Sequence, residues 1–405
     1  MTKTNSHVAS LMASEAYRRL VDTLAAEHER TVEDIVTLTQ IPSPPFQEAE
    51  RARAYEAMLR AHGLEDVEMD EVGNVMGIRP GTGNGPMIVV AAHLDTVFPA
   101  GTDVTVRREG TKLFAPGVGD DTRSLAVLLA YMRALDAAGI RTQSDILFVG
   151  DVGEEGLGDL RGIRHLFTKG KYRERIKAFI TVDSPEMDRI AVGGIGSKRY
   201  RVTFRGPGGH SFGAFGTVNP MYAMAQAMQE LAKTKVPEKP RTTFAVTVTG
   251  GGTSINAIPN EVWMDVDMRS QSAEELAKLE AHFEAVVHAA VAAENAERST
   301  RSGKIAAEFK LVGDRPAGET AVDSDLVQLA TAAITAHGFM PSHEFSSTDA
   351  NIPMSLGVPA IKVGSGGSGG RAHSLEEWID VEPTASVRGM AAGLTAILAV
   401  AGVAT

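Results

Sequence analysis

Histidine and acidic side chains stand where apolar segments of this chain end. His93 and Asp95 close the segment MIVVAAHLD, and the two-residue period of a strand places both side chains on one face. A histidine held by a nearby carboxylate is a common arrangement for a metal ligand, because the carboxylate fixes the tautomer of the ring. The pair could equally be structural, so it needs support from other positions.

Further groups of the same kind give that support. They are Asp120-Asp121 after the turn sequence APGVG, Glu154-Glu155 after the segment ILFVGD, Asp183 at the end of AFITVD, and His373 in a polar segment near the C-terminus. Singly, the aspartate pair could cap a helix and the glutamate pair could be a solvated turn. The carboxyl ends of parallel strands, however, meet at one edge of a sheet, where open α/β folds build their sites. Their joint placement therefore favours one shared metal site.

The residue types at these positions indicate the chemistry. Two histidines and three carboxylates form the ligand set of two divalent cations of the zinc, cobalt or manganese type, with one carboxylate bridging them. Thiolate ligands and disulfides are excluded because the chain has no cysteine. Of the adjacent Glu154 and Glu155, one can bind a metal while the other reaches the metal-bound water, whose pKa falls to about 7. This set predicts hydrolysis.

Composition limits the remaining possibilities. With 405 residues the chain exceeds one typical hydrophobic core, so two domains are expected. A net charge of −11 would repel a phosphate backbone, which makes nucleic acid an unfavourable partner and a small molecule the expected one. The N-terminal residues lack the apolar core of a signal peptide, and apolar stretches such as MIVVAA are too short to cross a membrane. We therefore expect a cytoplasmic protein without membrane association.

The elements that must position these residues follow from hydrophobic periodicity. Helical periodicity over about 14–62 is interrupted by the prolines of 41–46, which predicts two helices, and strands then alternate with helices up to AFITVDS. This alternation predicts an α/β fold with a mostly parallel sheet sandwiched by helices. The half-polar strands and two helices of 196–308 predict an inserted α+β domain, so that 1–195 and 309–405 form the metal-binding catalytic domain.

The glycine-rich segment 364–370, GSGGSGG, has the glycine spacing of a dinucleotide-binding loop. The polar sequence RAHSLEEW follows it instead of a helix, and too few residues remain for the mononucleotide-binding halves of such a domain. A nucleotide cofactor is therefore not expected.

Taken together, the motifs resemble a known family, the co-catalytic zinc metallopeptidases that include peptidase T, glutamate carboxypeptidase, succinyl-diaminopimelate desuccinylase and aminoacylase. The resemblance covers nearly the whole chain and rests on AAHLDTV, GVGDD, GDVGEEG, the Asp183 strand end, GPGGHS, INAIPNEVWMDVDMR and AHSLEEW. Relatives often have Lys-Gly or Lys-Ala after the aspartate pair. Here Thr122-Arg123-Ser124 stands there, which brings the chain nearer to the peptidase-T-like members.

The resemblance implies a role for each residue of the site. His93 and Asp183 would bind one metal, Glu155 and His373 the other, and Asp120 would bridge them. Glu154 would be the general base, Asp95 would orient His93, and the bond between Asp120 and Asp121 would be cis. The catalytic domain would have the phosphorylase/hydrolase-like fold of the family, with two zinc ions, or cobalt or manganese in their place.

For the inserted domain the resemblance implies a lid that also makes a homodimer. His210 would reach the partner subunit's active site and stabilise an oxyanion, and Asn256 and Arg269 would contact substrate, Arg269 by gripping a carboxylate. A loop histidine, a turn asparagine and a surface arginine are the structural alternatives.

Three functional hypotheses follow. The first is hydrolysis of an amide C–N bond in a peptide or N-acyl amino acid, and the second is hydrolysis of a non-peptide C–N bond at the same site by an aminohydrolase or deacylase. A catalytically silent binding protein is the third, and Glu154 argues against it because binding alone needs no proton acceptor beside a metal-bound water.

Overall fold

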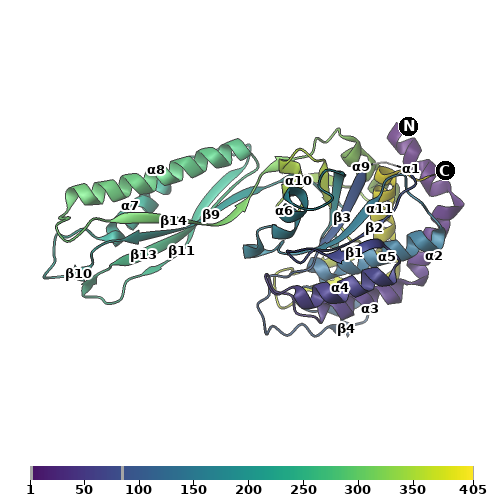
Figure 1. The fold of residues 1–405 in the computed structure, drawn as a ribbon, viewed down its shortest axis with the longest axis horizontal. Coiled ribbons are helices and arrows are strands. Elements are labelled where there is room, and N and C mark those ends of the chain that lie inside the picture. The colour runs from purple at the N-terminus through teal and green to yellow at the C-terminus, as the bar shows by residue number, and fades with distance from the viewer. Residues whose placement is uncertain (1–2, 84–85, 405) are drawn as a thin grey trace. The chain divides into compact units, whose positions relative to one another are not determined.

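The computed structural model describes residues 3–83 and 86–404, which separate into two compact units. The first unit comprises the chain up to Gly194 and again from Glu319, and the second is Ile195–Gly318 (Figure 1). The predicted insertion boundary at residue 308 is too early, since it falls inside strand β14 (Ala306–Arg315), which pairs along its length with β9 (Gly196–Arg205).

The first unit is built on a nine-stranded sheet. Its strand order is β1 (Glu65–Met69), β2 (Val75–Arg79), β6 (Ile146–Asp151), β3 (Met87–His93), β7 (Ile176–Val182), β17 (Ala360–Val363), β8 (Arg189–Gly194) and β15 (Gly318–Glu319), with β16 (Ser342–Ser346) paired to β8. The central strands β6, β3, β7 and β17 are parallel, whereas β1, β2 and β6 pair antiparallel. The predicted mostly parallel sheet is therefore confirmed for the part that carries the site.

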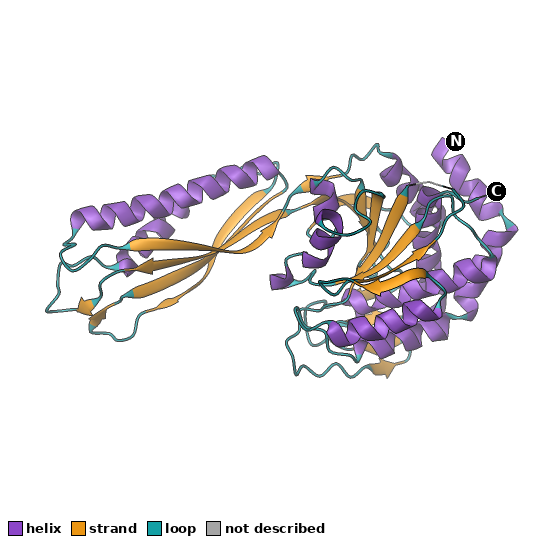
Figure 2. Cartoon of the chain, viewed as in Figure 1, coloured by secondary structure: helices purple, strands orange, loops and turns teal. Residues whose placement is uncertain are grey.

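Helices cover both faces of this sheet (Figure 2). They are α1 (Lys3–Ala13), α2 (Glu15–Ala26), α3 (His28–Thr39), α4 (Ala49–Ala61), α5 (Arg123–Ala138), α6 (Arg161–Thr168), α9 (Asp325–Ala336), α10 (Asn351–Ser355) and α11 (Pro383–Ala401). Alternate residues of β3 point to opposite faces: Val90 joins the core under α5 and α11, and Val89 joins the core under α6 and α10. Burial on both faces explains why β3 is apolar throughout.

The helical region before the prolines differs from the prediction. Two helices were expected over 14–62, but α2 and α3 are separate helices that divide at Glu27, and α4 follows the prolines. Glu27 caps the end of α2 with a non-helical ψ and also begins α3. A break without proline or glycine leaves the apolar periodicity almost intact, so periodicity alone does not reveal it.

A small sheet next to the main one holds the site loops. Its order is β18 (Ser368–Gly370), β19 (Trp378–Asp380), β5 (Lys112–Phe114) and β4 (Arg107–Glu109). Strands β19 and β5 pair antiparallel, so the segment after β5 and the segment before β19 lie side by side although they are far apart in sequence. The glycine-rich segment 364–370 thus ends in a strand, and no nucleotide-binding helix follows it.

The second unit is an antiparallel sheet with helices on one face, as an α+β insertion predicts. Its order is β11 (Thr242–Gly251), β13 (Glu261–Ser270), β9 and β14, with helices α7 (Pro220–Leu231) and α8 (Ala273–Glu297) and a short pair β10 (Gly209–His210) and β12 (Ala257–Ile258). Buried residues such as Val202, Met264 and Phe283 pack the sheet against the helices. The opposite face carries ion pairs such as Arg201 to Asp265 at 2.7 Å.

The ends of this insertion lie close together in the first unit. The chain leaves the main sheet at the end of β8 and re-enters it in β15, and these strands are neighbours in the strand order. The backbone N–H of Thr320 donates to the carbonyl of Val192 at 2.7 Å, which ties the two crossings together.

One helix of the described part of the chain is long and apolar enough to cross a membrane by length and composition alone. This is α11, and 78% of its apolar window is buried inside the fold, where it packs against α9 and α2. We therefore assign α11 to the protein core.

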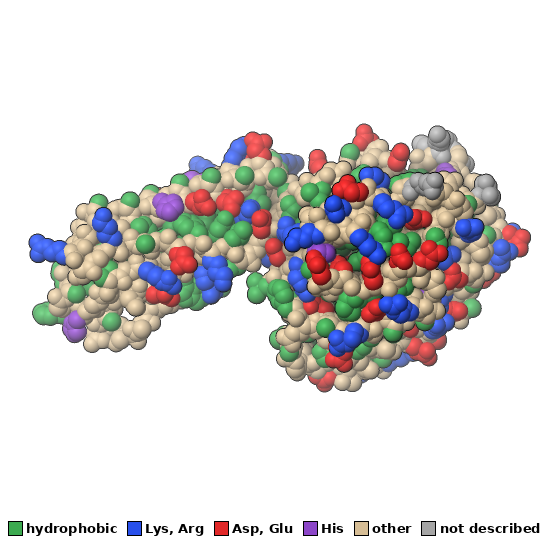
Figure 3. Space-filling view, viewed as in Figure 1, with side chains coloured by type: hydrophobic (Ala, Val, Ile, Leu, Met, Phe, Trp, Pro, Cys, Tyr) green, Lys and Arg blue, Asp and Glu red, His purple; other side chains and the backbone are tan. Residues whose placement is uncertain are grey.

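On the face drawn in Figure 3, acidic and basic side chains are interspersed over both units.

Candidate metal centre and active site

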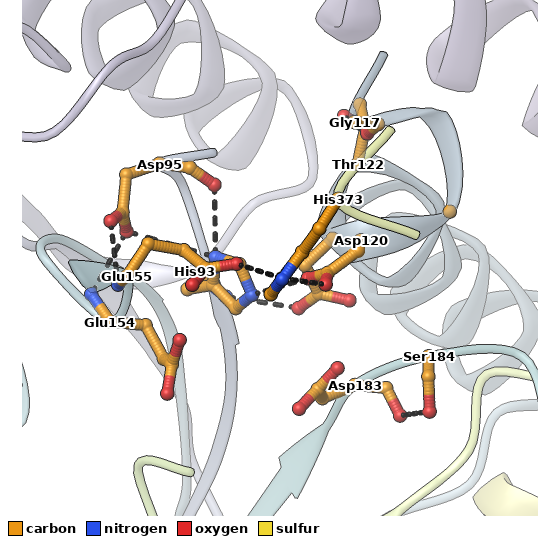
Figure 4. A network of polar contacts seen from close by, with 12 residues as sticks. His93, Asp95, Gly117, Asp120, Thr122, Glu154, Glu155, Asp183, Ser184 and His373 are labelled. Atoms are coloured by element: carbon orange, nitrogen blue, oxygen red, sulfur yellow. Dashed lines mark hydrogen bonds and ion pairs between the residues drawn. The ribbon is translucent and has the colours of Figure 1, made fainter. Parts of the chain in front are cut away.

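The proposed ligands of the first unit converge in space (Figure 4). His93 ends β3, Asp183 follows β7, and Glu154 and Glu155 follow β6, so the parallel strands deliver these side chains to one edge of the sheet. Asp120 lies in the irregular turn before α5, and His373 lies in the loop between β18 and β19. The predicted gathering of distant residues at the carboxyl edge is therefore what the structure shows.

The carboxylate of Asp120 lies between two histidines. Its Oδ1 is 3.0 Å from Nε2 of His93, and its Oδ2 is 3.1 Å from Nε2 of His373. His373 also lies 2.9 Å from Oε1 of Glu155. The peptide bond between Asp120 and Asp121 is cis, as the resemblance implies.

Among the residues that the structure describes, three groups of donor atoms are close enough to share a cation. Within each group, atoms of all members lie within 4.8 Å of one another, and the groups are His93 with Glu154 and Glu155, His93 with Asp121 and Asp183, and Asp120 with Glu155 and His373. The donors are imidazole nitrogens and carboxylate oxygens, the ligand types that suit zinc, cobalt or manganese. The residues therefore fit the metal pair that the resemblance implies.

The electrostatics of the pocket also favour bound cations. Burial, and then the neighbouring carboxylate of Asp120, raises the pKa of Asp183. Burial and Asp183 likewise raise the pKa of Asp121 well above its ordinary value, and Oδ1 of Asp121 is buried with no hydrogen-bond partner among the described residues. Carboxylates crowded together in this way disfavour their own ionisation, and a cation relieves that repulsion.

The surroundings favour the charged form of the two histidines, whereas they favour the neutral form of these carboxylates. Burial opposes protonation of His93, but the carboxylates of Asp121, Asp120 and Asp95 outweigh it and raise its pKa well above the ordinary value. Hydrogen bonds to Asp120 and Glu155 raise the pKa of His373 to about 11. Burial alone would raise the pKa of Asp120, yet the two histidines hold it below its usual range. Without cations, both histidines therefore hold a proton more tightly than an ordinary imidazole does.

Asp95 makes a contact that the sequence did not suggest. Its backbone carbonyl is 2.9 Å from Nδ1 of His93, whereas its carboxylate oxygen is 3.7 Å from that nitrogen. The carboxylate instead accepts the backbone N–H groups of Glu154 at 3.0 Å and Glu155 at 2.9 Å. Asp95 is fully buried, so it fixes the loop that carries both glutamates as well as the ring of His93.

Glu377 is a further residue of the site that the sequence analysis did not single out, although it lies in the quoted motif AHSLEEW. Its carboxylate accepts the backbone N–H groups of Gly117, Gly119 and Asp120, each at 2.8 Å. Burial raises its pKa to about 7 despite these three donors. Only the fold reveals this role, because Glu377 and Asp120 are 257 positions apart.

The sequence analysis also missed a pair of buried aspartates, Asp151 and Asp349. Asp151 ends β6 beside His93 in the parallel ladder, and both it and Asp349 are buried. Within the described part of the chain, their four carboxylate oxygens have no hydrogen-bond partner. Burial raises the pKa of Asp151 to about 7 and that of Asp349 well above its ordinary value. No sequence spacing distinguishes this pair from ordinary acidic residues.

The predicted substrate residues lie in the second unit. His210 and Asn256 are neighbours, since β10 pairs with β12 and the N–H of Ser211 donates to the carbonyl of Asn256 at 2.9 Å. Arg269 stands near the opposite end of β13, about 26 Å along the strand from Glu261. The structure therefore groups His210 with Asn256 and leaves Arg269 apart from them.

Arg269 lies in a hollow of about 270 Å³ lined by Ile195, Arg241, Thr243, Arg269 and Gln271. Its Nε donates to Asp267 at 2.8 Å, and Asp267 also accepts from Arg199 at 3.0 Å. One carboxylate thus serves two guanidinium groups, and Arg241 adds a second positively charged side chain to the lining of the hollow.

Sequence comparison decides the family. Residues 89–399 match the sequence profile of peptidase family M20/M25/M40. The chain belongs to this family. It is 26% identical over 367 residues to the succinyl-diaminopimelate desuccinylase of Corynebacterium glutamicum, covering 87% of this chain and 94% of that enzyme. The resemblance inferred from the motifs is confirmed.

Solved structures of several similar proteins share the fold. The aminopeptidase PepT from Bacillus cereus superposes with a TM-score of 0.73 at 23% identity, covering 91% of this chain and 98% of that one. The YXEP protein of Bacillus subtilis, described as a dinuclear metal binding peptidase of the M20 family, superposes with a TM-score of 0.67 at 18% identity, covering 93% and 99%. This M20 member is therefore a hydrolase, and its reaction is metal-dependent cleavage of an amide bond.

Proposed function

We propose that this M20 hydrolase cleaves the amide C–N bond of a peptide or an N-acyl amino acid with Glu154 as the general base. The ligands that we propose for two divalent cations are His93 and Asp183 for one, Glu155 and His373 for the other, and Asp120 between them. Zinc is the proposed metal, with cobalt and manganese as the alternatives for this nitrogen and oxygen donor set.

The observation that carries the proposal is the position of Asp120. Its two carboxylate oxygens face different histidines, His93 at 3.0 Å and His373 at 3.1 Å. A carboxylate that presents one oxygen to each of two ligand groups is arranged to bridge two cations. When bound, the cation pair would supply a water of lowered pKa and would polarise the carbonyl of the substrate.

Glu154 is suited to move the proton. Its backbone is anchored through the N–H that it donates to Asp95, and its carboxylate belongs to the donor group of His93 and Glu155. It is buried, with 6% of its surface exposed. We propose that it accepts a proton from the attacking water and delivers it to the leaving nitrogen, which converts a poor leaving group into an amine.

The second unit supports a substrate with a carboxylate. The charge left over beside Arg269 and Arg241 favours an anionic group in that hollow, and Arg269 can grip it through two parallel hydrogen bonds. We propose His210 and Asn256 as further substrate contacts. The named desuccinylase relative acts on an N-acyl compound, which agrees with this substrate class.

A non-peptide C–N bond is the second candidate. The fold is shared with a putative aminohydrolase from Staphylococcus aureus and a hydantoinase/carbamoylase family amidase from Burkholderia ambifaria, with TM-scores of 0.69 and 0.62. The same site could therefore serve either bond.

We also propose that the second unit is a lid and makes a homodimer, and that the protein acts in the cytoplasm. Large apolar side chains are exposed on this unit, with Phe212 at 88%, Phe215 at 90% and Ile255 fully exposed. Strand β11 is also an edge strand, whose free backbone groups can pair with another chain. Both features support a second copy as the partner.

The test combines metal content with a substrate panel. The protein is reconstituted with zinc, cobalt or manganese and assayed against di- and tripeptides, N-acyl amino acids, aryl amides and ureido compounds. We expect two metal ions per chain and cleavage that a chelator abolishes. Activity that survives complete removal of metal would refute the proposal, and cleavage of ureido compounds alone would favour the second candidate.

A further inference from the structure

The turn that carries Asp120 is built around the buried carboxylate of Glu377. Residues 117–120 present three hydrogen-bond donors to it: the N–H of Gly117 points to Oε2, and those of Gly119 and Asp120 point to Oε1. Glu377 is 1% exposed, so water does not compete for these bonds. The carboxylate therefore determines the backbone path immediately before the proposed bridging residue.

The turn has the shape that this contact requires. Gly117 has a φ of 76°, a conformation that favours glycine, and Thr122 closes the turn by donating its hydroxyl to the carbonyl of Gly117 at 2.5 Å. A Cβ added to Gly119 would lie 2.9 Å from Ile379 and 3.1 Å from Oε1 of Glu377. Close approach of the turn to the carboxylate thus depends on glycine at this position.

Hydrogen bonds of its own backbone fix Glu377 relative to the loop that carries His373. It precedes β19, which pairs with β5, and its backbone carbonyl accepts the N–H of Ala115 at 3.2 Å. It stands four positions after His373, and its own N–H donates to the carbonyl of Ser374 at 3.1 Å. One residue therefore connects the loop of His373 with the turn of Asp120.

We propose that Glu377 is a positioning residue for the metal centre, which holds the backbone of 117–120 so that the two oxygens of Asp120 face His93 and His373. This inference rests on the proposed bridging role of Asp120. Glu377 does not touch the cations or the substrate in this scheme. Its effect is exerted through the three backbone N–H groups and through the loop that it shares with His373.

The variant Glu377→Gln tests this role, because the amide keeps the size of the side chain but turns one acceptor oxygen into a donor that faces an N–H group. We expect the affinity for the second of two Co²⁺ ions to fall at least tenfold in a chelator-competition titration. We also expect kcat to fall with KM nearly unchanged, and the visible spectrum and magnetic coupling of the Co²⁺ pair to change, since these report the geometry of the bridge.

Glu294→Gln is the matched control. Glu294 is also buried, at 4% exposed, and accepts the backbone N–H of Asn219 at 2.9 Å, but it belongs to the second unit and pairs with Arg298. A loss of stability common to both variants would appear as a similar fall in the melting temperature of the metal-free proteins. Only Glu377→Gln should alter the second Co²⁺ affinity and the spectrum.

If Glu377→Gln does not fold, Gly119→Ala tests the same contact from the side of the turn, and the same readouts are expected to change. Two Co²⁺ bound with wild-type affinity and an unchanged spectrum in a folded variant would overturn the positioning role while leaving the proposed function intact. The proposed function is judged separately on the wild type, by its two bound ions and its metal-dependent cleavage.

Discussion

Nε2 of His373 lies 2.9 Å from Oε1 of Glu155, although 218 positions separate the two residues in sequence. Together with Asp120, this contact raises the pKa of His373 to about 11. In the metal-free site, the raised pKa favours a charged His373 between the carboxylates of Asp120 and Glu155. The contact stabilises the metal-free fold fully below pH 6.5, the ordinary pKa of histidine, and that stabilisation is lost as the pH rises through about 11.

Metal uptake near neutral pH should consequently release protons. An imidazolium cannot coordinate a cation, so His373 and His93 must each give up one proton when the metals bind. Calorimetric titration with Zn²⁺ in buffers of different ionisation enthalpy measures this release. An observed enthalpy that does not depend on the buffer would contradict the assignment of these histidines as ligands.

Glu154→Ala should separate catalysis from metal binding. We expect turnover to fall by about 10²–10⁴-fold, the usual contribution of general base catalysis, while both metal ions remain bound. His93→Ala should lose both metal and activity. Metal analysis and steady-state kinetics on the same preparations distinguish the two variants, and an active Glu154 variant would refute its role.

Asp95→Asn should weaken the loop of the two glutamates. The substitution replaces an oxygen that accepts from Glu154 or Glu155 by a donor, and an unsatisfied buried N–H costs about 1–3 kcal/mol. Denaturant unfolding of the metal-free protein measures the loss.

Asp70→Asn is the control for that experiment. The Asp70 carboxylate accepts three backbone N–H groups, those of Val72, Gly73 and Asn74, in the turn between β1 and β2. The Asp70→Asn variant should have a lower free energy of unfolding but an unchanged affinity for metal. We expect Asp95→Asn to lose activity as well, and full activity in that variant would show that the loop holds its shape without the carboxylate.

Asp151 should make the metal-free protein less stable at higher pH. Its folded-state pKa is raised to about 7, so its contribution is fully present below 3.8 and is lost as the pH rises through about 7. In Asp151→Asn the free energy of unfolding should therefore fall less between about pH 5 and pH 8. Denaturant unfolding across this range measures the difference, and parallel pH profiles for variant and wild type would contradict it.

Phe215→Glu should disrupt the proposed homodimer. A charge in an apolar contact between copies must be desolvated, whereas the same charge on a free surface costs little. Light scattering should give the mass of a single chain for this variant and of a dimer for the wild type. Met340→Glu, at a side chain of the first unit that is 88% exposed, is the control and should leave the mass unchanged.

The sequence predicted those parts of the site that depend on strand ends. His93 and Asp183 follow parallel strands, and the edge on which they meet is determined by the α/β topology, which hydrophobic periodicity indicates. Asp120 and His373 lie on loops instead. Their convergence was inferred from the motifs as a set, and the structure confirms that Asp120 lies between His93 and His373.

The residues that were missed share a physical cause. Glu377 and Asp349 lie beside groups that come near only after folding, as do the two N–H groups that the carboxylate of Asp95 accepts, and an acidic residue in sequence does not reveal these neighbours. The boundary at 308 failed for a similar reason, because β14 belongs to the second unit through its pairing with β9, a contact across about a hundred residues.

The neighbouring positions of β8 and β15 mean that the second unit is attached to the first by two adjacent crossings. A short turn could replace residues 195–317 without rerouting any strand of the main sheet. The proposed metal centre and the second unit are thus separable modules, and a shortened protein of this design should still bind its metals.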